Sequence, residues 1–240
     1  MQPLTYTTQQ NETTQSAALS PLTRALLVGG VIAGPLYIAL GVLQVLIRPG
    51  YDVTRHDLSL MANGSLGWIQ IGNFIVTGLL TIAGALGMRR AMPAGKGRTW
   101  GPILVAVYGL GLIGAGFFSA DPALGFPPGT PADAHAISAH GLLHFVSGGL
   151  GFLGLIAACV VFARRFASQG QRGWAAYSLI TGVLFFLAFF GIASGSNQSG
   201  EALTFVVLAF TAAVVLGWAW VSVMAVRLLA SSPWPKSKLG

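Results

Sequence analysis

The stretch ALLVGGVIAGPLYIALGVLQVLI, residues 25–47, decides the fold class of this chain. It carries no charged residue, and it is long enough to cross a bilayer, since about 30 Å of hydrocarbon takes around 20 helical residues. Each such run must be helical, because a lone strand leaves its backbone groups unsatisfied in lipid. Five more apolar runs follow, at roughly 67–88, 101–120, 138–163, 174–194 and 202–229. The sequence therefore predicts an all-α polytopic membrane protein, a bundle of six transmembrane helices.

The composition agrees with a membrane protein and excludes several other classes. Of 240 residues, 54% are hydrophobic and only 8% are charged, whereas soluble domains carry about a quarter charged residues. The chain is basic, but its lysines and arginines are scattered at the ends of the apolar runs, so no nucleic-acid partner is expected. The single cysteine, Cys159, excludes an intramolecular disulfide and a CxxC motif. The lipid bilayer is the expected partner.

The distribution of charge predicts the orientation. Eleven of the 13 lysines and arginines fall on one side of the predicted membrane, and only Arg48 and Arg55 fall on the other. Five of the six acidic residues share that other side, with Glu12 the exception. The positive-inside rule then places both termini in the cytoplasm, and the inner (plasma) membrane of the cell is the expected location.

The chain is predicted to have one membrane domain and two tails. Residues 1–24 are polar and rich in Thr and Gln, which is typical of a disordered cytoplasmic tail. The six-span domain covers residues 25–229, and a second cytoplasmic tail covers 230–240. Within the first span, Gly30 and Gly34 share one helical face, and that face is expected to contact another helix closely.

The first extracytoplasmic loop is long and carries charges of both signs. Its segment 54–61 is expected to form a short interfacial helix, with Leu58 and Met61 facing lipid and His56 and Asp57 facing elsewhere. The second such loop begins at the end of the third span.

Polar residues at this side of the membrane form a candidate site. Asp121 is expected at the C-terminus of the third helix, where a carboxylate opposes the helix dipole and a basic partner or a metal would relieve it. His140 and His144 stand at i and i+4, so both imidazoles can reach one point, which is a spacing that helical metal sites use. Asn73 and Ser147 could line the same polar cavity.

Two interpretations of this candidate site stay open. In the first, His140 and His144 bind a divalent metal such as zinc with a third ligand from His56, Asp57 or Asp121, and a coordinated water becomes the nucleophile. In the second, these groups satisfy one another and hold the outer helix ends together. The second is preferred, because a His-x-x-x-His pair alone is a weak signal. His135, in a loop, is expected to be a solvated surface residue.

Several stretches carry a family resemblance: Tyr51-Asp52, His56-Asp57-Leu58-Ser59-Leu60, Gly67-Trp68, Asn73-Phe74 with Gly78, Asp121-Pro122 and His140-Gly-Leu-Leu-His144. They resemble the family catalogued as domain of unknown function 998, over roughly residues 25–229. The resemblance implies a multi-span membrane protein of bacteria or archaea, and it supplies no mechanism. A looser likeness is to the membrane hydrolases that include alkaline ceramidases, which hold zinc with three histidines beside Asp and Ser. Those hydrolases have seven spans, so this likeness is analogy only.

Three functions are compatible with these features. The first is a membrane protein whose extracytoplasmic His/Asp cluster has a structural or binding role, with envelope proteins among its partners. The alternative is a metal-dependent hydrolase of lipid or amide bonds at the outer leaflet, in which Asp57 or Asp121 is a ligand or general base and Ser59 orients the substrate. A small transporter is a further alternative, although the apolar middles of the spans disfavour a proton-coupled one.

Overall fold

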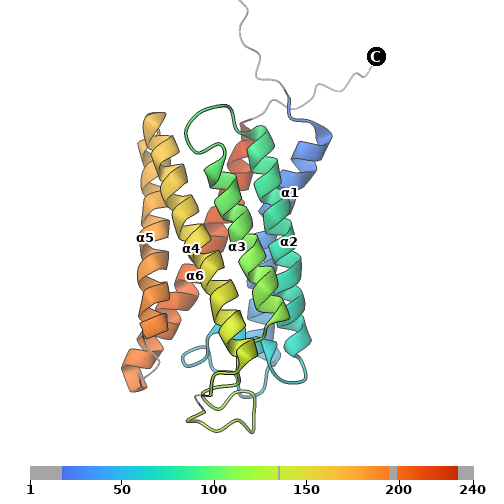
Figure 1. Cartoon of the computed structure of the whole chain (residues 1–240), viewed down its shortest axis with the longest axis vertical. Helices are drawn as coiled ribbons and strands as arrows, with labels where there is room; N and C mark the ends of the chain where they lie inside the picture. The colour runs from blue at the N-terminus through green and yellow to red at the C-terminus, as the bar shows by residue number, and fades with distance from the viewer. Residues whose placement is uncertain (1–17, 135, 195–198, 232–240) are drawn as a thin grey trace, which may run out of the picture.

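The computed structural model describes residues 18–134, 136–194 and 199–231 and contains six long helices (Figure 1). All six are long and apolar enough to cross a membrane, and the described residues contain no strand. The prediction of an all-α, multi-span membrane protein is therefore confirmed. The elements in order are α1 (Pro21–Ile47), the 3-10 helix η1 (Leu58–Ala62), α2 (Gly67–Ala91), α3 (Trp100–Phe117), α4 (Ala139–Ser168), α5 (Arg172–Ser194) and α6 (Gly200–Ala230).

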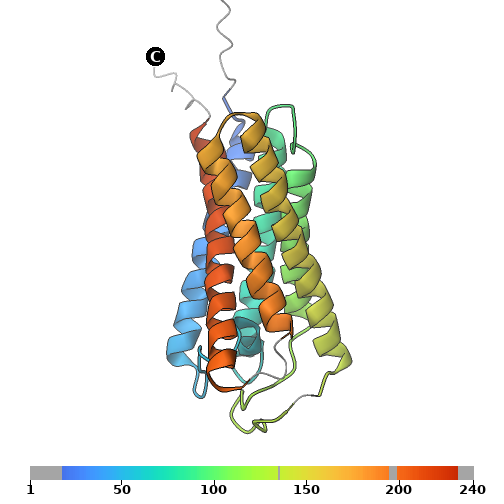
Figure 2. The same ribbon diagram turned by 90° about the vertical axis from the view of Figure 1, so that its left-hand side faces the viewer.

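The helices are arranged as a ring in chain order. Each helix packs against its neighbours in sequence, and α1 packs against α6 to close the ring (Figure 2). Aromatic side chains fill much of the centre. Tyr37 of α1 stacks on Trp218 of α6 with 4.8 Å between ring centroids, and Tyr108 of α3 lies 5.3 Å from the same indole.

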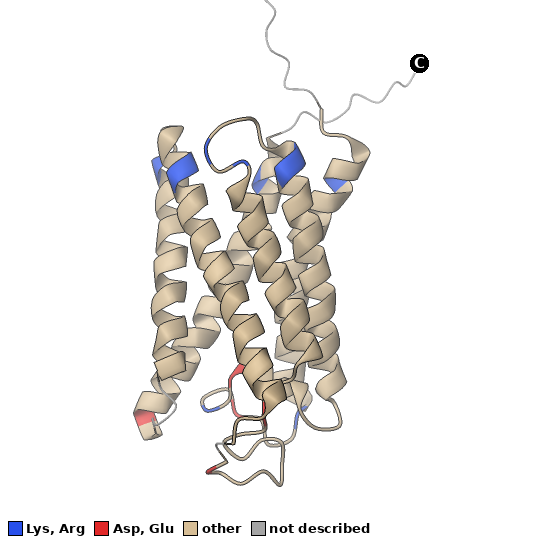
Figure 3. Cartoon of the chain, in the orientation of Figure 1, with Lys and Arg blue, Asp and Glu red and all other residues tan. Residues whose placement is uncertain are grey.

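The two ends of the bundle differ in charge (Figure 3). We call the end where α1 begins and α6 finishes the basic end, because most of the described lysines and arginines lie there. The opposite end, where the α1–α2, α3–α4 and α5–α6 connections lie, is the acidic end, because the acidic side chains of the described residues lie there (Figure 3). Arg48 and Arg55 belong to the α1–α2 connection at this end. The separation of charge that the sequence predicts is present in the fold.

Helix boundaries differ from the predicted spans by a few residues. Helix α1 begins at Pro21, earlier than the predicted span, because the Ser20 side chain accepts a hydrogen bond from the Thr23 N–H (3.2 Å) and proline suits the first helical position. Helix α3 ends at Phe117, three residues before the predicted limit of its span. Helix α4 continues to Ser168, beyond the apolar part of its sequence.

Glycines set the closest approaches of α1 to its neighbours. A Cβ at Gly30 would lie 3.0 Å from the Cα of Gly84 in α2, and a Cβ at Gly34 would lie 2.7 Å from the carbonyl oxygen of Trp218 in α6. The face that carries Gly30 and Gly34 therefore contacts two helices, which confirms the prediction that it packs closely.

Candidate functional site

Two loops at the acidic end fold together into a compact structure that we call the cap, residues 48–66 and 118–138 except 135. The ring of Phe126 lies at its centre and is only 1% exposed. The rings of Tyr51 and His56 each approach it to 5.4 Å between centroids, and the Arg48 guanidinium carbon lies 5.3 Å from the same ring. The side chains that pack on Phe126 thus come from the first loop, whereas Phe126 belongs to the second.

His56 joins the two loops of the cap through both ring nitrogens. Its Nδ1 accepts a hydrogen bond from the Asp52 N–H (2.9 Å), so the proton of the neutral ring lies on Nε2. Nε2 then donates to the Leu124 carbonyl oxygen (3.1 Å) in the other loop. The imidazole is 3% exposed, and neither nitrogen is left to bind an ion in this arrangement.

Asp57 starts the short helix η1. Its Oδ1 accepts hydrogen bonds from the Ser59 N–H (3.0 Å), the Leu60 N–H (3.2 Å) and the Ser59 hydroxyl (2.5 Å). These hydrogen bonds make Asp57 the N-cap residue of η1, so the helix begins at Leu58. The predicted helix over 54–61 is therefore wrong in its start. The predicted lipid-facing side is also wrong, because Met61 is fully buried.

Arg48 stabilises the first loop of the cap by hydrogen bonds to backbone carbonyl oxygens. Its Nη1 donates to the Met61 carbonyl oxygen (2.9 Å), and its Nη2 donates to the carbonyl oxygen of Asn63. The side chain is 7% exposed, and this burial lowers the pKa of the guanidinium from its usual value. From the sequence, Arg48 is expected only as an outer charge and a candidate partner of Asp121, although an arginine directly after an apolar run is a signal for such a role.

Asp121 lies at the start of α4 and not at the end of α3. Its two carboxylate oxygens accept hydrogen bonds from the N–H (2.8 Å) and the hydroxyl (2.6 Å) of Ser138, the N-cap of α4. The carboxylate packs directly against Gly141, where a Cβ would have no room. The expectation that Asp121 opposes a helix dipole is therefore wrong, because a carboxylate at a helix N-terminus is stabilised.

His144 lies in the second turn of α4 and is buried, whereas His140 in the first turn is exposed. The Nδ1 of His144 lies 2.7 Å from the Phe118 carbonyl oxygen and 3.2 Å from that of Ala115, so it donates to the C-terminal end of α3. Its Nε2 has no hydrogen-bond partner in the part of the chain that the structure describes. The His140 ring packs edge-on against Phe118, 5.6 Å between centroids.

The described residues contain no group of three His, Cys, Asp or Glu side chains that could share a metal ion. His56 uses both nitrogens elsewhere, and Asp121 is engaged at the start of α4. A metal bound by His140 and His144 stays a prediction. His135 lies outside the described residues.

Asn73 and Ser147 belong to different helix interfaces. Ser147 lies between α3 and α4, where a Cβ at Gly114 would meet its hydroxyl at 2.7 Å. Asn73 lies between α1 and α2, and its Nδ2 donates to the Tyr37 carbonyl oxygen (3.2 Å) and to Gln70 Oε1 (3.3 Å).

Asn73 is part of a buried group of side-chain amides, which we call the amide cluster: Gln44, Gln70 and Asn73. Gln44 Nε2 donates to Gln70 Oε1 (2.8 Å), and Gln70 Nε2 donates to the Tyr37 hydroxyl (3.4 Å). All three amides are at most 1% exposed. Gln44 Oε1, Asn73 Oδ1 and the nearby Trp218 Nε1 are buried without a hydrogen-bond partner in the described part of the chain. Neither glutamine is among the predicted site residues, although each is a polar residue inside an apolar run.

Residues 31–227 match the family model described as "Protein of unknown function (DUF998)". The chain belongs to the DUF998 family. This confirms the resemblance found in the sequence, and no curated protein and no solved structure matches the chain.

The DUF998 region contains the cap and the amide cluster, which differ in chemistry. In the cap, both ring nitrogens of His56, the Oδ1 of Asp57 and both carboxylate oxygens of Asp121 bond to backbone or hydroxyl groups of the protein. In the amide cluster, Gln44 Oε1 and Asn73 Oδ1 are buried and have no hydrogen-bond partner among the described residues. The His56, Asp57 and Asp121 side chains of the cap are thus engaged within the protein, whereas two acceptors of the amide cluster have no described partner.

Proposed function

We propose that this DUF998 protein is a binding protein of the membrane, in which the amide cluster takes a small polar ligand and the cap covers the acidic end. The ligand is one that donates hydrogen bonds. The observation that carries this proposal is the pair of buried, unpartnered oxygens, Gln44 Oε1 and Asn73 Oδ1.

Free energy supports a ligand at the amide cluster. A buried acceptor without a partner costs about 1–3 kcal/mol, and lipid tails offer no donor to relieve that cost. A bound molecule with N–H or O–H groups would supply the missing bonds. The stacked rings of Tyr37 and Trp218 lie beside the cluster, and aromatic faces attract ammonium groups, so small amines are the first ligands to test.

We expect a ligand from a panel of small amines, amino acids and polyols, ethanolamine among them, to raise the Tm of the detergent-purified protein. At about 100 times its Kd, a ligand adds about 2.7 kcal/mol, which shifts the Tm of a protein of this size by roughly 5–10 °C. Gln44→Met removes one free oxygen at nearly constant volume and should abolish the shift. Thr81→Val is the control, because that hydroxyl bonds only to its own helix. An unchanged shift in Gln44→Met, or no shift by any compound, would contradict the proposal.

A metal-dependent hydrolase is the second candidate, and one observation favours it. A metal-binding histidine usually donates its other ring N–H to a backbone carbonyl, which fixes the tautomer. His144 has that arrangement, with Nδ1 on the Phe118 carbonyl and Nε2 free. Zinc therefore belongs in the same thermal panel. A zinc-dependent rise in Tm that both His140→Ala and His144→Ala abolish would favour the hydrolase over the binding protein.

We also propose that both termini are cytoplasmic, since the basic end carries most of the described cationic side chains (Figure 3). Cys159 is fully buried, so an introduced cysteine can be labelled on a silent background. In intact bacterial cells, a membrane-impermeant maleimide should label Glu201→Cys at the acidic end. It should label Arg90→Cys at the basic end only after permeabilisation. The reverse pattern would invert the topology.

A further inference from the structure

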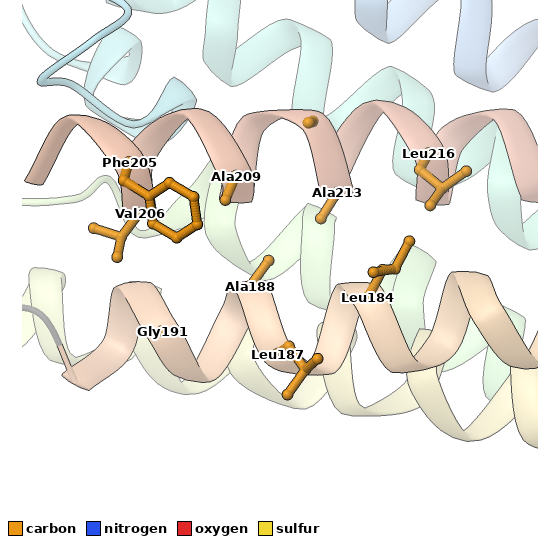
Figure 4. A pocket seen from close by; sticks show the side chains of 10 residues that line it. Leu184, Leu187, Ala188, Gly191, Phe205, Val206, Ala209, Ala213 and Leu216 are labelled. Carbon is orange, nitrogen blue, oxygen red and sulfur yellow. The ribbon is translucent and has the colours of Figure 1, made fainter. Parts of the chain in front are cut away.

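A groove of about 370 Å³ separates α5 and α6 in the half of the bundle nearer the acidic end (Figure 4). Small residues face each other across it, Ala188 and Gly191 on α5 and Ala209 on α6. Larger apolar side chains, among them Leu187 and Phe205, also line it. No polar side chain of the described residues is among its lining.

A gap between two helices is unexpected where their facing residues are small. In membrane proteins, small side chains at an interface normally let two helices approach until their backbones touch. Here α5 and α6 stay apart at their small residues. An empty gap of this size would forfeit the dispersion contacts of every lining atom, so a molecule from the surroundings is expected to fill it.

The position of the groove limits what that molecule is. The lining on α6 runs from Phe205 to Leu216, a rise of about 16 Å at 1.5 Å per residue. That length is about half of the ~30 Å hydrocarbon core. The groove begins one turn after Glu201, which lies at the acidic end, so it covers the depth of a single leaflet.

We infer that the groove binds one acyl chain of a phospholipid from the leaflet at the acidic end. The lining offers only apolar contacts, which suit an alkyl chain and would leave the backbone of an extended peptide segment unsatisfied. Leu187 and Phe205 are exposed and flank the chain, and Ala209 lies beneath it.

The test is native mass spectrometry of protein that has been reconstituted into vesicles of equal parts phosphatidylethanolamine and phosphatidylglycerol and then extracted in mild detergent. We expect the wild type to retain one phospholipid. Ala209→Phe places a ring where the chain lies and should lower retention about tenfold, because several buried methylene contacts are lost. Ala39→Phe, an equal change at an exposed position of α1, should retain the lipid. Ala188→Leu is a second filling variant, should Ala209→Phe fail to fold.

Three outcomes would overturn the inference. Equal retention by the wild type, Ala39→Phe and the filling variants would mean that the lipid is an unspecific annular one. A bound mass equal to a free fatty acid would assign the groove to a different source. A dimer that dissociates in Ala209→Phe or Ala188→Leu would make the groove a contact between two copies of the chain.

Discussion

Gly78→Ala is expected to destabilise the bundle by about 2–3 kcal/mol, whereas Gly72→Ala in the same helix should leave stability unchanged or raise it by up to about 1 kcal/mol. A Cβ at Gly78 would lie 2.7 Å from the Gly109 carbonyl oxygen and 2.8 Å from Ile113 Cγ1. A Cβ at Gly109 would in turn lie 2.7 Å from the Gly78 carbonyl oxygen. The backbones of α2 and α3 thus touch at this crossing, and an added methyl group must push them apart.

Gly72 is the matched control because, apart from the adjoining backbone of α2 itself, a Cβ there meets no described atom within 4 Å. Circular dichroism during unfolding in mixed micelles would give the difference in free energy between the two variants. If Gly78→Ala proved as stable as Gly72→Ala, α2 and α3 could not be in direct backbone contact. The crossing matters for the amide cluster, since α2 carries both Gln70 and Asn73.

The sequence predicts the helices of this protein well because the bilayer imposes a simple rule. A run of about 20 apolar residues must be helical and must cross, and this rule needs no knowledge of tertiary contacts. The helix ends differ from the predicted span limits where local hydrogen bonds decide them. One example is Ser20, whose side chain caps α1 before the apolar run begins. The same applies to Asp57, which moved the start of the short helix to Leu58.

The candidate site was harder to predict because its partners come from different parts of the chain. His56 bonds to Leu124, and Asp121 bonds to Ser138 across the second loop, and neither pairing follows from spacing along one helix. The glutamines of the amide cluster were missed for a related reason. A single glutamine in an apolar run hardly changes its hydropathy, and only the packing of α1 on α2 brings Gln44 to Gln70.

Phe126→Ala is expected to open the cap. Truncation of a buried phenylalanine costs about 3–5 kcal/mol, and this ring supports Tyr51, His56 and Arg48 together. The substitution should lower the free energy of local opening of the cap and leave the stability of the helices unchanged. The reason is that the ring belongs to a small apolar cluster with Leu60, separate from the core of the bundle. Hydrogen exchange of the cap amides, such as the His56 N–H that bonds to the Asp52 carbonyl oxygen (2.8 Å), should accelerate by more than about 100-fold.

Phe117→Ala is the control for Phe126→Ala, since Phe117 is the last residue of α3 and its side chain is 68% exposed. Removal of the Phe117 ring should change the hydrogen-exchange rates of the cap amides by less than about tenfold, because little of that ring is buried.

Gln44 lies one turn before the end of α1, and Gln70 lies one turn after the start of α2, so the cap follows directly on the helix ends that carry the amide cluster. An open cap should therefore also speed dissociation of a ligand that stabilises the wild type. Faster exchange in the cap with unchanged ligand dissociation would show that the cap is structural only and that the ligand reaches the amide cluster by another route.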